Sequence, residues 1–344
     1  MEKNIIQNPN FVYKNTFNII ENDLFEINNA FDIYSLQKDI NKIYLCGSSE
    51  FAREIIDIFE FKGNKFEKKL SLKNHKEFIV GCKYFLNKKL KKEYLVSIDN
   101  GQSSSNSIIF QIINENIYNE ILNIVNIYES IRHPFSLIFD YNSENNQLFY
   151  IHQKTDVDSE VISENKEIVK NINFTQRQVL YYDVWENSKN NKNYIVQCNT
   201  NYIYIYDIFS QDKKFIKIDG KDIYGKNFSS YILYNKNGKD ILYIINEKGN
   251  IIFYDLLDNK ITSIIKMNDI GLRSSCQFNE KYLIFLSKDG FFFIFDYNSK
   301  KIITKVCSSI LSNVKTIKMI NHNVYGKNIL MSGFMRGLLL YKSL

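Results

Sequence analysis

The sequence of 344 residues is long enough for two ordinary domains or one large repeat fold, and its 44% hydrophobic residues can fill a sizeable core. The formal net charge of +6 comes from 44 basic and 38 acidic residues that are mixed along the chain, which argues against nucleic acid as the main partner. No apolar stretch has the length of a membrane span and the start has no secretory signal, so we expect no membrane contact.

Short apolar runs follow one another along the chain. Runs of four to six residues rich in Ile, Tyr, Phe and Val alternate with clusters of Asn, Lys, Ser and Asp. This spacing is typical of β-strands, and no long segment keeps a helical period. We expect residues 1–9 to form a flexible N-terminus and residues 11–20 to form a strand.

A repeat of strands follows this first segment. Residues 241–255 and 282–296 show it most clearly, because each has an apolar run, a polar turn and a second apolar run that ends in an aromatic residue and Asp. The repeated units are expected to begin near Phe31, Phe78, Phe135, Val179, Phe228, Leu272 and Val314. These starts are 42 to 57 residues apart, and four-stranded propeller blades repeat at roughly 40–45 residues before loops are added. The sequence therefore predicts seven blades.

The third unit and the last unit depart from the regular pattern. In the third unit, the polar stretch 153–167 is expected to be an insertion that replaces or interrupts the third strand. The last unit stops after its third strand at Leu344, and the strand at 11–20 is left over. Pairing these two segments would complete the last blade, close the ring and cover an exposed sheet edge. We therefore predict an all-β fold, a single seven-bladed β-propeller over residues 10–344.

The units resemble WD40 repeats in a divergent form that covers residues 10–344. The aromatic–Asp pair that ends the third strand of such repeats is present as Tyr206-Asp207, Tyr254-Asp255 and Phe295-Asp296. The Gly-His pair before the first strand is echoed by Asn74-His75 and Arg132-His133. Tryptophan is missing from every third strand, and Trp185 lies at the end of a first strand. The resemblance implies a β-propeller that scaffolds other proteins, usually without catalysis.

The resemblance also implies a structural role for His75. In WD40 repeats a histidine at this position is hydrogen-bonded to a turn Asp and a strand Ser, and Asp99 and Ser97 are the matching partners here. By the same comparison, Asp207, Asp255 and Asp296 are structural positions. The remaining histidines, His152 and His322, lie in different units and have no further ligand at metal-binding spacing.

Other chemical signatures are absent from the sequence. It has no phosphate-binding loop, nucleophile elbow or dinucleotide fingerprint, and its carboxylates stand singly in turns. The five cysteines are isolated and mostly inside apolar runs, which is typical of buried thiols in a reducing compartment. We therefore expect a cytoplasmic protein that is not an enzyme and holds no metal or other cofactor.

Arginine is rare in this lysine-rich chain. The five arginines are Arg53, Arg132, Arg177, Arg273 and Arg336. Three of them precede or begin first strands, and two lie in turns between second and third strands, which are loops that open on one face of a WD40 propeller. Arginine binds carboxylate or phosphate through a planar fork that lysine lacks. We predict that these side chains bind an acidic or phosphorylated peptide. The alternative is that they bind only local carbonyls and turn aspartates.

Three functions remain open from the sequence. The first is an intracellular adaptor or complex subunit that binds other proteins. The second is a structural subunit of a large ribonucleoprotein or cytoskeletal assembly that uses the lysine-rich loop 88–92. The third is a propeller hydrolase, which the lack of converging acids and histidines argues against. Steep salt dependence would indicate nucleic acid, because phosphate binding releases counterions.

Overall fold

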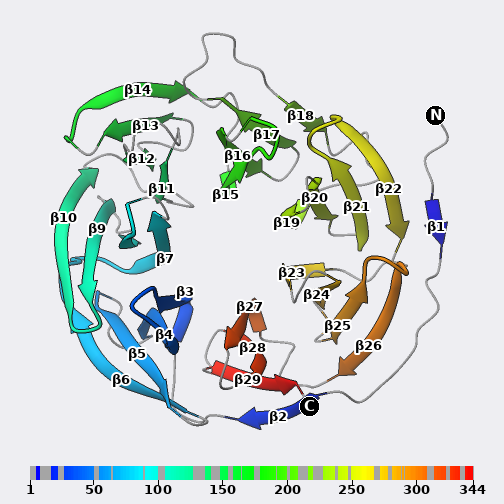
Figure 1. Ribbon diagram of the computed structural model, residues 1–344, viewed down its shortest axis with the longest axis horizontal. Coiled ribbons are helices and arrows are strands. Elements are labelled where there is room, and N and C mark those ends of the chain that lie inside the picture. Colours follow the sequence, from blue (N-terminus) through cyan, green and yellow to red (C-terminus); the bar gives the residue numbers. More distant parts are fainter. Residues whose placement is uncertain are drawn as a thin grey trace. The chain divides into compact units, whose positions relative to one another are not determined.

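The computed structural model describes most of the strands and part of the turns. The described residues are 5–7, 17–21, 27–49, 54–62, 65–87, 90–99, 105–126, 136–140, 148–153, 158–163, 165–173, 179–190, 192–199, 202–207, 216–219, 228–236, 239–246, 249–266, 272–277, 281–287, 289, 291–307, 314–322, 326–333 and 338–343. Within these ranges the chain is all β, contains no helix, and forms seven small, mainly antiparallel sheets (Figure 1). The chain divides into two compact units.

One unit comprises residues 18–178 and 320–343. Three of its sheets each contain four strands in chain order. These are β3–β6 (Ile27–Leu36, Asp39–Ser49, Ile56–Lys62, Lys65–Leu72), β7–β10 (Ile79–Asn87, Lys92–Asp99, Ser105–Asn114, Ile117–Asn126) and β11–β14 (Ser136–Asp140, Leu148–Gln153, Asp158–Ser163, Ile168–Asn173). Strand β3 lies against β7, and β11 lies against β8, so these sheets are neighbours in the order of the chain.

The stretch 153–167 is a correction to the sequence analysis. It was expected to be an insertion, but Asp158–Ser163 forms strand β13, which pairs with β12 and β14. Val161 and Ile162 are buried, and so are the small side chains of Ser159 and Ser163. A search for apolar runs misses a strand that contains serine, because serine is polar but small enough to pack in the interior.

The first and last parts of the chain meet in another sheet. Strand β2 (Phe17–Glu21) is the neighbour of β29 (Leu338–Ser343), followed by β28 (Gly326–Gly333) and β27 (Val314–His322). The sequence analysis expected residues 11–20 in this edge position, and β2 overlaps the second half of that range. Residues 11–16 lie outside the described residues. This pairing covers one edge of the sheet with a strand from far away in the sequence.

The other unit comprises residues 1–17 and 179–319, with Leu344. Its three sheets again hold four strands in chain order. They are β15–β18 (Val179–Glu186, Asn193–Asn199, Tyr202–Tyr206, Ile216–Asp219), β19–β22 (Phe228–Lys236, Lys239–Asn246, Asn250–Asp255, Lys260–Lys266) and β23–β26 (Leu272–Gln277, Tyr282–Ser287, Phe291–Asp296, Lys301–Cys307). Strand β19 lies against both β15 and β23.

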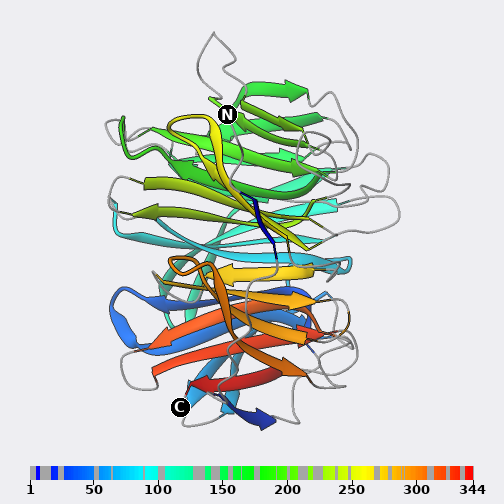
Figure 2. The ribbon, with the colours of Figure 1, turned by 90° about the vertical axis from the view of Figure 1, so that its right-hand side faces the viewer.

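A fifth strand extends the sheet β19–β22. Strand β1 (Ile5–Gln7) pairs in parallel with β22, with Ile5 opposite Ile264 and Gln7 opposite Lys266, and Figure 2 shows it alongside β22. Residues 5–7 fall within the segment 1–9 that the sequence analysis expected to be a flexible N-terminus, and they form a strand here. Strand β22 is otherwise an edge with unpaired backbone groups, which can bind any short extended segment within reach.

A recurrent bulge relates four of the sheets to one another. In each, the register between first and second strand shifts directly after the first pair, at Ile79/Gly81, Val179/Tyr181, Phe228/Ser230 and Leu272/Ser274. A bulge bends the strand and increases its twist, so the position of the bulge is a characteristic feature of the backbone. Because the bulge recurs at one position, these sheets are copies of one structural unit.

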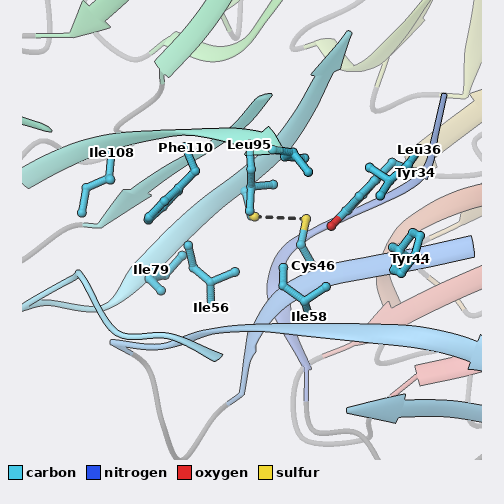
Figure 3. Packing of buried hydrophobic residues seen from close by; sticks show 12 residues of the cluster. Tyr34, Leu36, Tyr44, Cys46, Ile56, Ile58, Ile79, Leu95, Ile108 and Phe110 are labelled. Carbon is cyan, nitrogen blue, oxygen red and sulfur yellow. Dashed lines mark hydrogen bonds between the residues drawn. The ribbon is translucent and has the colours of Figure 1, made fainter. Parts of the chain in front are cut away.

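Buried side chains from neighbouring sheets form the core. In Figure 3, residues of the sheets β3–β6 and β7–β10 pack together, among them Tyr34, Cys46, Ile58 and Phe110. The sulfur atoms of Cys46 and Cys82 are 3.2 Å apart in this layer. The second strands are buried along nearly their whole length, as β8 is from Glu93 to Asp99, which explains why they appear in the sequence as continuous apolar runs.

Candidate functional site

Most of the predicted arginine face lies outside the described residues. This holds for Arg53, Arg132, Arg177 and Arg336. Arg273 is the second residue of β23, at its bulge, and its side chain is not among those described. The arrangement of the five arginines therefore stays a prediction.

His75, Ser97 and Asp99 lie together in the interior. Nδ1 of His75 is 2.9 Å from Oδ2 of Asp99, and its Nε2 is 2.7 Å from Oγ of Ser97. His75 belongs to the connection between β6 and β7, whereas Ser97 and Asp99 stand two residues apart near the end of β8. Residues two apart on a strand project from the same face, so both can reach one imidazole ring.

Asp99 is also fixed by the start of β9. Its Oδ1 accepts a hydrogen bond of 2.6 Å from the backbone nitrogen of Asn106, and its Oδ2 accepts one of 3.2 Å from the Asn106 side chain. Burial alone would raise the pKa of Asp99, but the hydrogen bonds from His75 and Asn106 outweigh it and lower the pKa below the ordinary value of 3.8. Asp99 is thus an ionised acceptor at neutral pH.

Ser, His and Asp hydrogen-bonded in this order also form the triad of many hydrolases, in which the serine hydroxyl must be accessible to the substrate. All three side chains are buried, and Ser97 has no exposed surface. In the neutral ring Nδ1–H donates to Asp99 and Nε2 accepts the Ser97 hydroxyl proton. A nucleophile has to reach a substrate, and this hydroxyl is enclosed by protein. The cluster therefore fastens the segment before β7 to β8 and β9.

The aspartates at the ends of two third strands close the turns that follow. Oδ1 of Asp255 accepts hydrogen bonds of 3.0 Å from the backbone nitrogens of Leu257 and Asp258. Oδ1 of Asp296 accepts hydrogen bonds of 2.9 Å and 3.3 Å from the nitrogens of Asn298 and Ser299. Such contacts are characteristic of Asx-turns. Asp207 directly follows β17 and is partly buried.

Trp185 has a partner that the sequence analysis missed. It is the last but one residue of β15 and is buried, and its Nε1–H donates to Oδ2 of Asp240 on β20 at 3.0 Å. The same oxygen accepts a hydrogen bond of 2.9 Å from the Ser188 nitrogen. The signals available in the sequence were the single Trp of the chain and an Asp directly before the apolar run 241–245.

Two exposed apolar residues stand next to the His75 cluster. Phe78 and Val80 flank the buried Ile79 at the start of β7, and both are exposed. His75 holds this start in place through its contacts with β8. Side chains at a rigid strand end are suited to bind a partner, because little conformational entropy is lost when they are covered.

The described residues hold no group of three or more His, Cys, Asp or Glu side chains placed to bind a metal ion. Within the same part of the chain, no helix has the length and apolar character needed to cross a membrane.

Comparison with known proteins identifies structural but not sequence relatives. No protein-family model matches the sequence, and no curated protein matches it. The crystal structure of BBS1N in complex with ARL6DN matches with a TM-score of 0.64 and 13% identity over 94% of each chain. Raptor from Chaetomium thermophilum matches with a TM-score of 0.67 and 11% identity. The latter alignment covers 96% of this chain but only 29% of the Raptor chain. At these identities the likeness concerns the fold, which is all-β and propeller-like.

Proposed function

We propose that the chain is a non-catalytic scaffold or adaptor that binds other proteins, built as a single seven-bladed, WD40-like propeller over residues 10–344. One observation carries this proposal: the His75 cluster is buried, and the apolar side chains of Phe78 and Val80 next to it are exposed. The polar side chains of the cluster bond to one another, whereas Phe78 and Val80 present apolar surface that a partner can cover. BBS1N, which shares the fold, was crystallised with ARL6DN, and this supports a protein partner.

The binding face that we propose combines these apolar residues with the arginines. On the strand map of the sequence, Arg132, Arg177 and Arg273 precede or begin first strands, as Phe78 does in the second unit. In a propeller such positions open on one face. An acidic or phosphorylated peptide would fit this face, because each guanidinium binds carboxylate or phosphate through two hydrogen bonds.

The test is affinity purification of the tagged full-length chain from its native organism. The wild type is compared with a variant in which Arg132, Arg177 and Arg273 are all Lys, and with Phe78→Ser/Val80→Ser. We expect both variants to lose a shared partner, because Lys keeps the charge but not the bidentate geometry. Partners that are unchanged in the arginine variant would refute the arginine face and leave the scaffold function standing. The scaffold function fails if the wild type captures no protein.

The compartment that we propose is the cytoplasm. Among the described residues, Cys46, Cys82 and Cys276 form no disulfide, and the first two are close together in the core. An oxidising compartment favours disulfides, whereas the cytosol keeps thiols reduced. Fractionation of cells with an antibody to the chain tests this point, and recovery in a secreted or luminal fraction would contradict it.

A second candidate is a structural subunit of a ribonucleoprotein or cytoskeletal assembly. Lys91, in the turn before β8, and Lys92, the first residue of that strand, are exposed. If they bind RNA, affinity must fall steeply as salt is raised. Titration of the chain with labelled single-stranded RNA at two salt concentrations tests the ribonucleoprotein role, and a salt-independent or undetectable affinity excludes that role.

A further inference from the structure

Three hairpin turns of one unit are tied together by hydrogen bonds. They are the turns between β3 and β4, between β7 and β8, and between β9 and β10. The backbone nitrogen of Gln37 in the first turn donates to Oε1 of Glu93 at the start of β8, at 2.8 Å. Oε2 of Glu115 in the third turn accepts hydrogen bonds from Lys42 at 2.8 Å and Tyr44 at 2.9 Å, both on β4. The three turns are therefore held at one end of two neighbouring sheets.

The strand register brings the second and third turns to the same end. Ile112 of β9 is paired with Glu93 of β8, so the next residue, Ile113, lies level with Lys92. Ile117 pairs with Asn114 across the turn between β9 and β10. The hydroxyl groups of Tyr118 and Tyr34 are 2.7 Å apart, which links β10 to β3 as well.

Exposed aliphatic side chains lie on the strands beside these turns. Ile40 is 59% exposed, Ile113 41% and Ile117 46%. They make up three of the seven large hydrophobic residues that are exposed among the described side chains. Single exposed apolar residues are ordinary, but a group on adjacent rigid turns indicates a surface that a partner covers.

The acidic side chains at the three turns form ion pairs or hydrogen bonds within the chain. Glu115 also has Lys69 at 3.2 Å from Oε1, and Asp39 has Lys42 at 2.9 Å. Glu93 is buried and accepts a second hydrogen bond, of 2.7 Å, from the Tyr84 hydroxyl.

The lysines at the turns, in contrast, face solvent. Lys38, Lys91 and Lys92 are exposed, and none of them forms an ion pair with another described residue. Lys91 has a φ of 52°, so a lysine occupies the left-handed position of its turn. The surface thus presents aliphatic side chains beside uncompensated positive charge.

We propose that this surface, the hairpin patch of Lys38, Ile40, Lys91, Lys92, Ile113 and Ile117, binds an acidic segment of a partner protein that carries aliphatic side chains. The proposal rests on the scaffold function but not on the arginines, none of which belongs to the patch. Apolar side chains of the segment would cover the isoleucines, and its carboxylates would pair with the lysines. A peptide fits better than RNA, because isoleucine offers neither a hydrogen bond to phosphate nor an aromatic face on which a base can stack.

Binding of defined probes to the full-length chain tests the proposal. The first probe is a short fluorescein-labelled peptide of Leu and Glu interspersed with Ser. In the second, Ser replaces each Leu, and in the third, Lys replaces each Glu. We expect measurable fluorescence anisotropy binding for the first peptide only. The patch variants Ile40→Ser/Ile113→Ser/Ile117→Ser and Lys38→Glu/Lys91→Glu/Lys92→Glu should each weaken it by about tenfold or more, since both contacts are required.

Matched controls make the outcome decisive. Ile168→Ser/Val169→Ser removes another exposed aliphatic pair, on β14, and should leave the affinity unchanged. Circular dichroism melts establish that each variant is folded. Equal binding of the Leu-free peptide, unchanged affinity of the folded isoleucine variant, or no binding of any peptide would overturn the proposal. Binding of labelled single-stranded RNA in preference to the peptides, with a steep salt dependence, would assign the patch to nucleic acid instead.

Affinity purification from the native organism separates this proposal from the proposed function. The wild type is compared with the isoleucine variant and with the arginine variant. If protein partners are captured but none depends on the isoleucines, the hairpin patch is refuted while the scaffold function stands. Loss of a partner that the arginine variant retains supports a separate binding surface at the patch.

Discussion

Nε1–H of Trp185 donates a hydrogen bond of 3.0 Å to Oδ2 of Asp240, which joins the first strand of one sheet to the second strand of the next. Both residues are buried. Tyr194 packs on the indole, with ring centroids 5.0 Å apart, and the backbone nitrogen of Ser188 donates to the same carboxylate oxygen. A buried carboxylate depends on such donors, because it has lost its hydration.

Trp185→Phe tests this link. Phe keeps most of the packing but removes the donor, so Asp240 is left with fewer hydrogen bonds in the interior. We expect the free energy of unfolding to fall by about 1–3 kcal/mol. Urea unfolding followed by far-ultraviolet circular dichroism measures the change. Tyr194→Phe, which removes a hydroxyl bonded to the exposed Asn190, is the matched control and should cost less than about 0.5 kcal/mol. Equal effects of the two variants would contradict this account.

The His75 cluster gives a second prediction. His75→Leu removes a donor to Asp99 and a partner of Ser97, and leaves a buried carboxylate with only Asn106 as a described partner. We expect a loss of about 2–4 kcal/mol, larger than for Ser97→Ala, because an ionised group becomes undersatisfied in the first variant only. Thermal and urea unfolding measure which variant loses more free energy of unfolding. Lys76→Ala, at the exposed next residue, should be neutral. A larger cost for Ser97→Ala than for His75→Leu would refute the role given to Asp99.

Glu115 predicts a pH dependence of stability. Hydrogen bonds from Lys42, Tyr44 and Lys69 lower the pKa of Glu115 from its ordinary value of 4.5 to about 2. Because the pKa is lower in the folded state, this stabilisation is fully present above about pH 4.5 and is lost as the pH falls towards 2. The urea midpoints of the wild type and Glu115→Gln should therefore differ at pH 7 and approach each other as the pH is lowered from 4.5 to 2. A difference between the two midpoints that stays constant over this range would contradict the prediction.

The repetitive part of the fold could be predicted from the sequence because its second strands are buried on both faces. Strands such as β24, which is apolar up to its last residue, Ser287, stand out between polar turns. The aromatic–Asp pairs mark turns for a local reason, since the carboxylate of Asp296 caps backbone nitrogens two and three residues later. A contact of this kind depends on adjacent residues, so a sequence pattern can reveal it.

Features that depend on distant residues escaped the sequence analysis. Strand β13 was missed because Ser159 and Ser163 fill buried positions, and β1 was missed because three residues form a strand only where an edge such as β22 is available. The hairpin patch was missed for a related reason. Ile40 and Ile117 lie in different sheets, and neither is unusual on its own. Their grouping depends on the contact between Lys42 and Glu115, which is a property of the folded chain.

Gly81 gives the last prediction, because it occupies the bulge of β7. A Cβ atom at this position would lie 2.8 Å from Cγ2 of Ile98, which is closer than van der Waals contact allows. Gly81→Ala should therefore destabilise the chain by about 1–3 kcal/mol through overpacking. Ile98→Ala removes the opposing methyl group and is itself expected to cost about 2–4 kcal/mol as a cavity mutation. If the clash is the cause, Gly81→Ala should cost little in the Ile98→Ala background, and a double-mutant cycle in urea measures this coupling. Additive effects of the two substitutions would mean that Gly81 is required by the backbone of the bulge and not by its contact with Ile98.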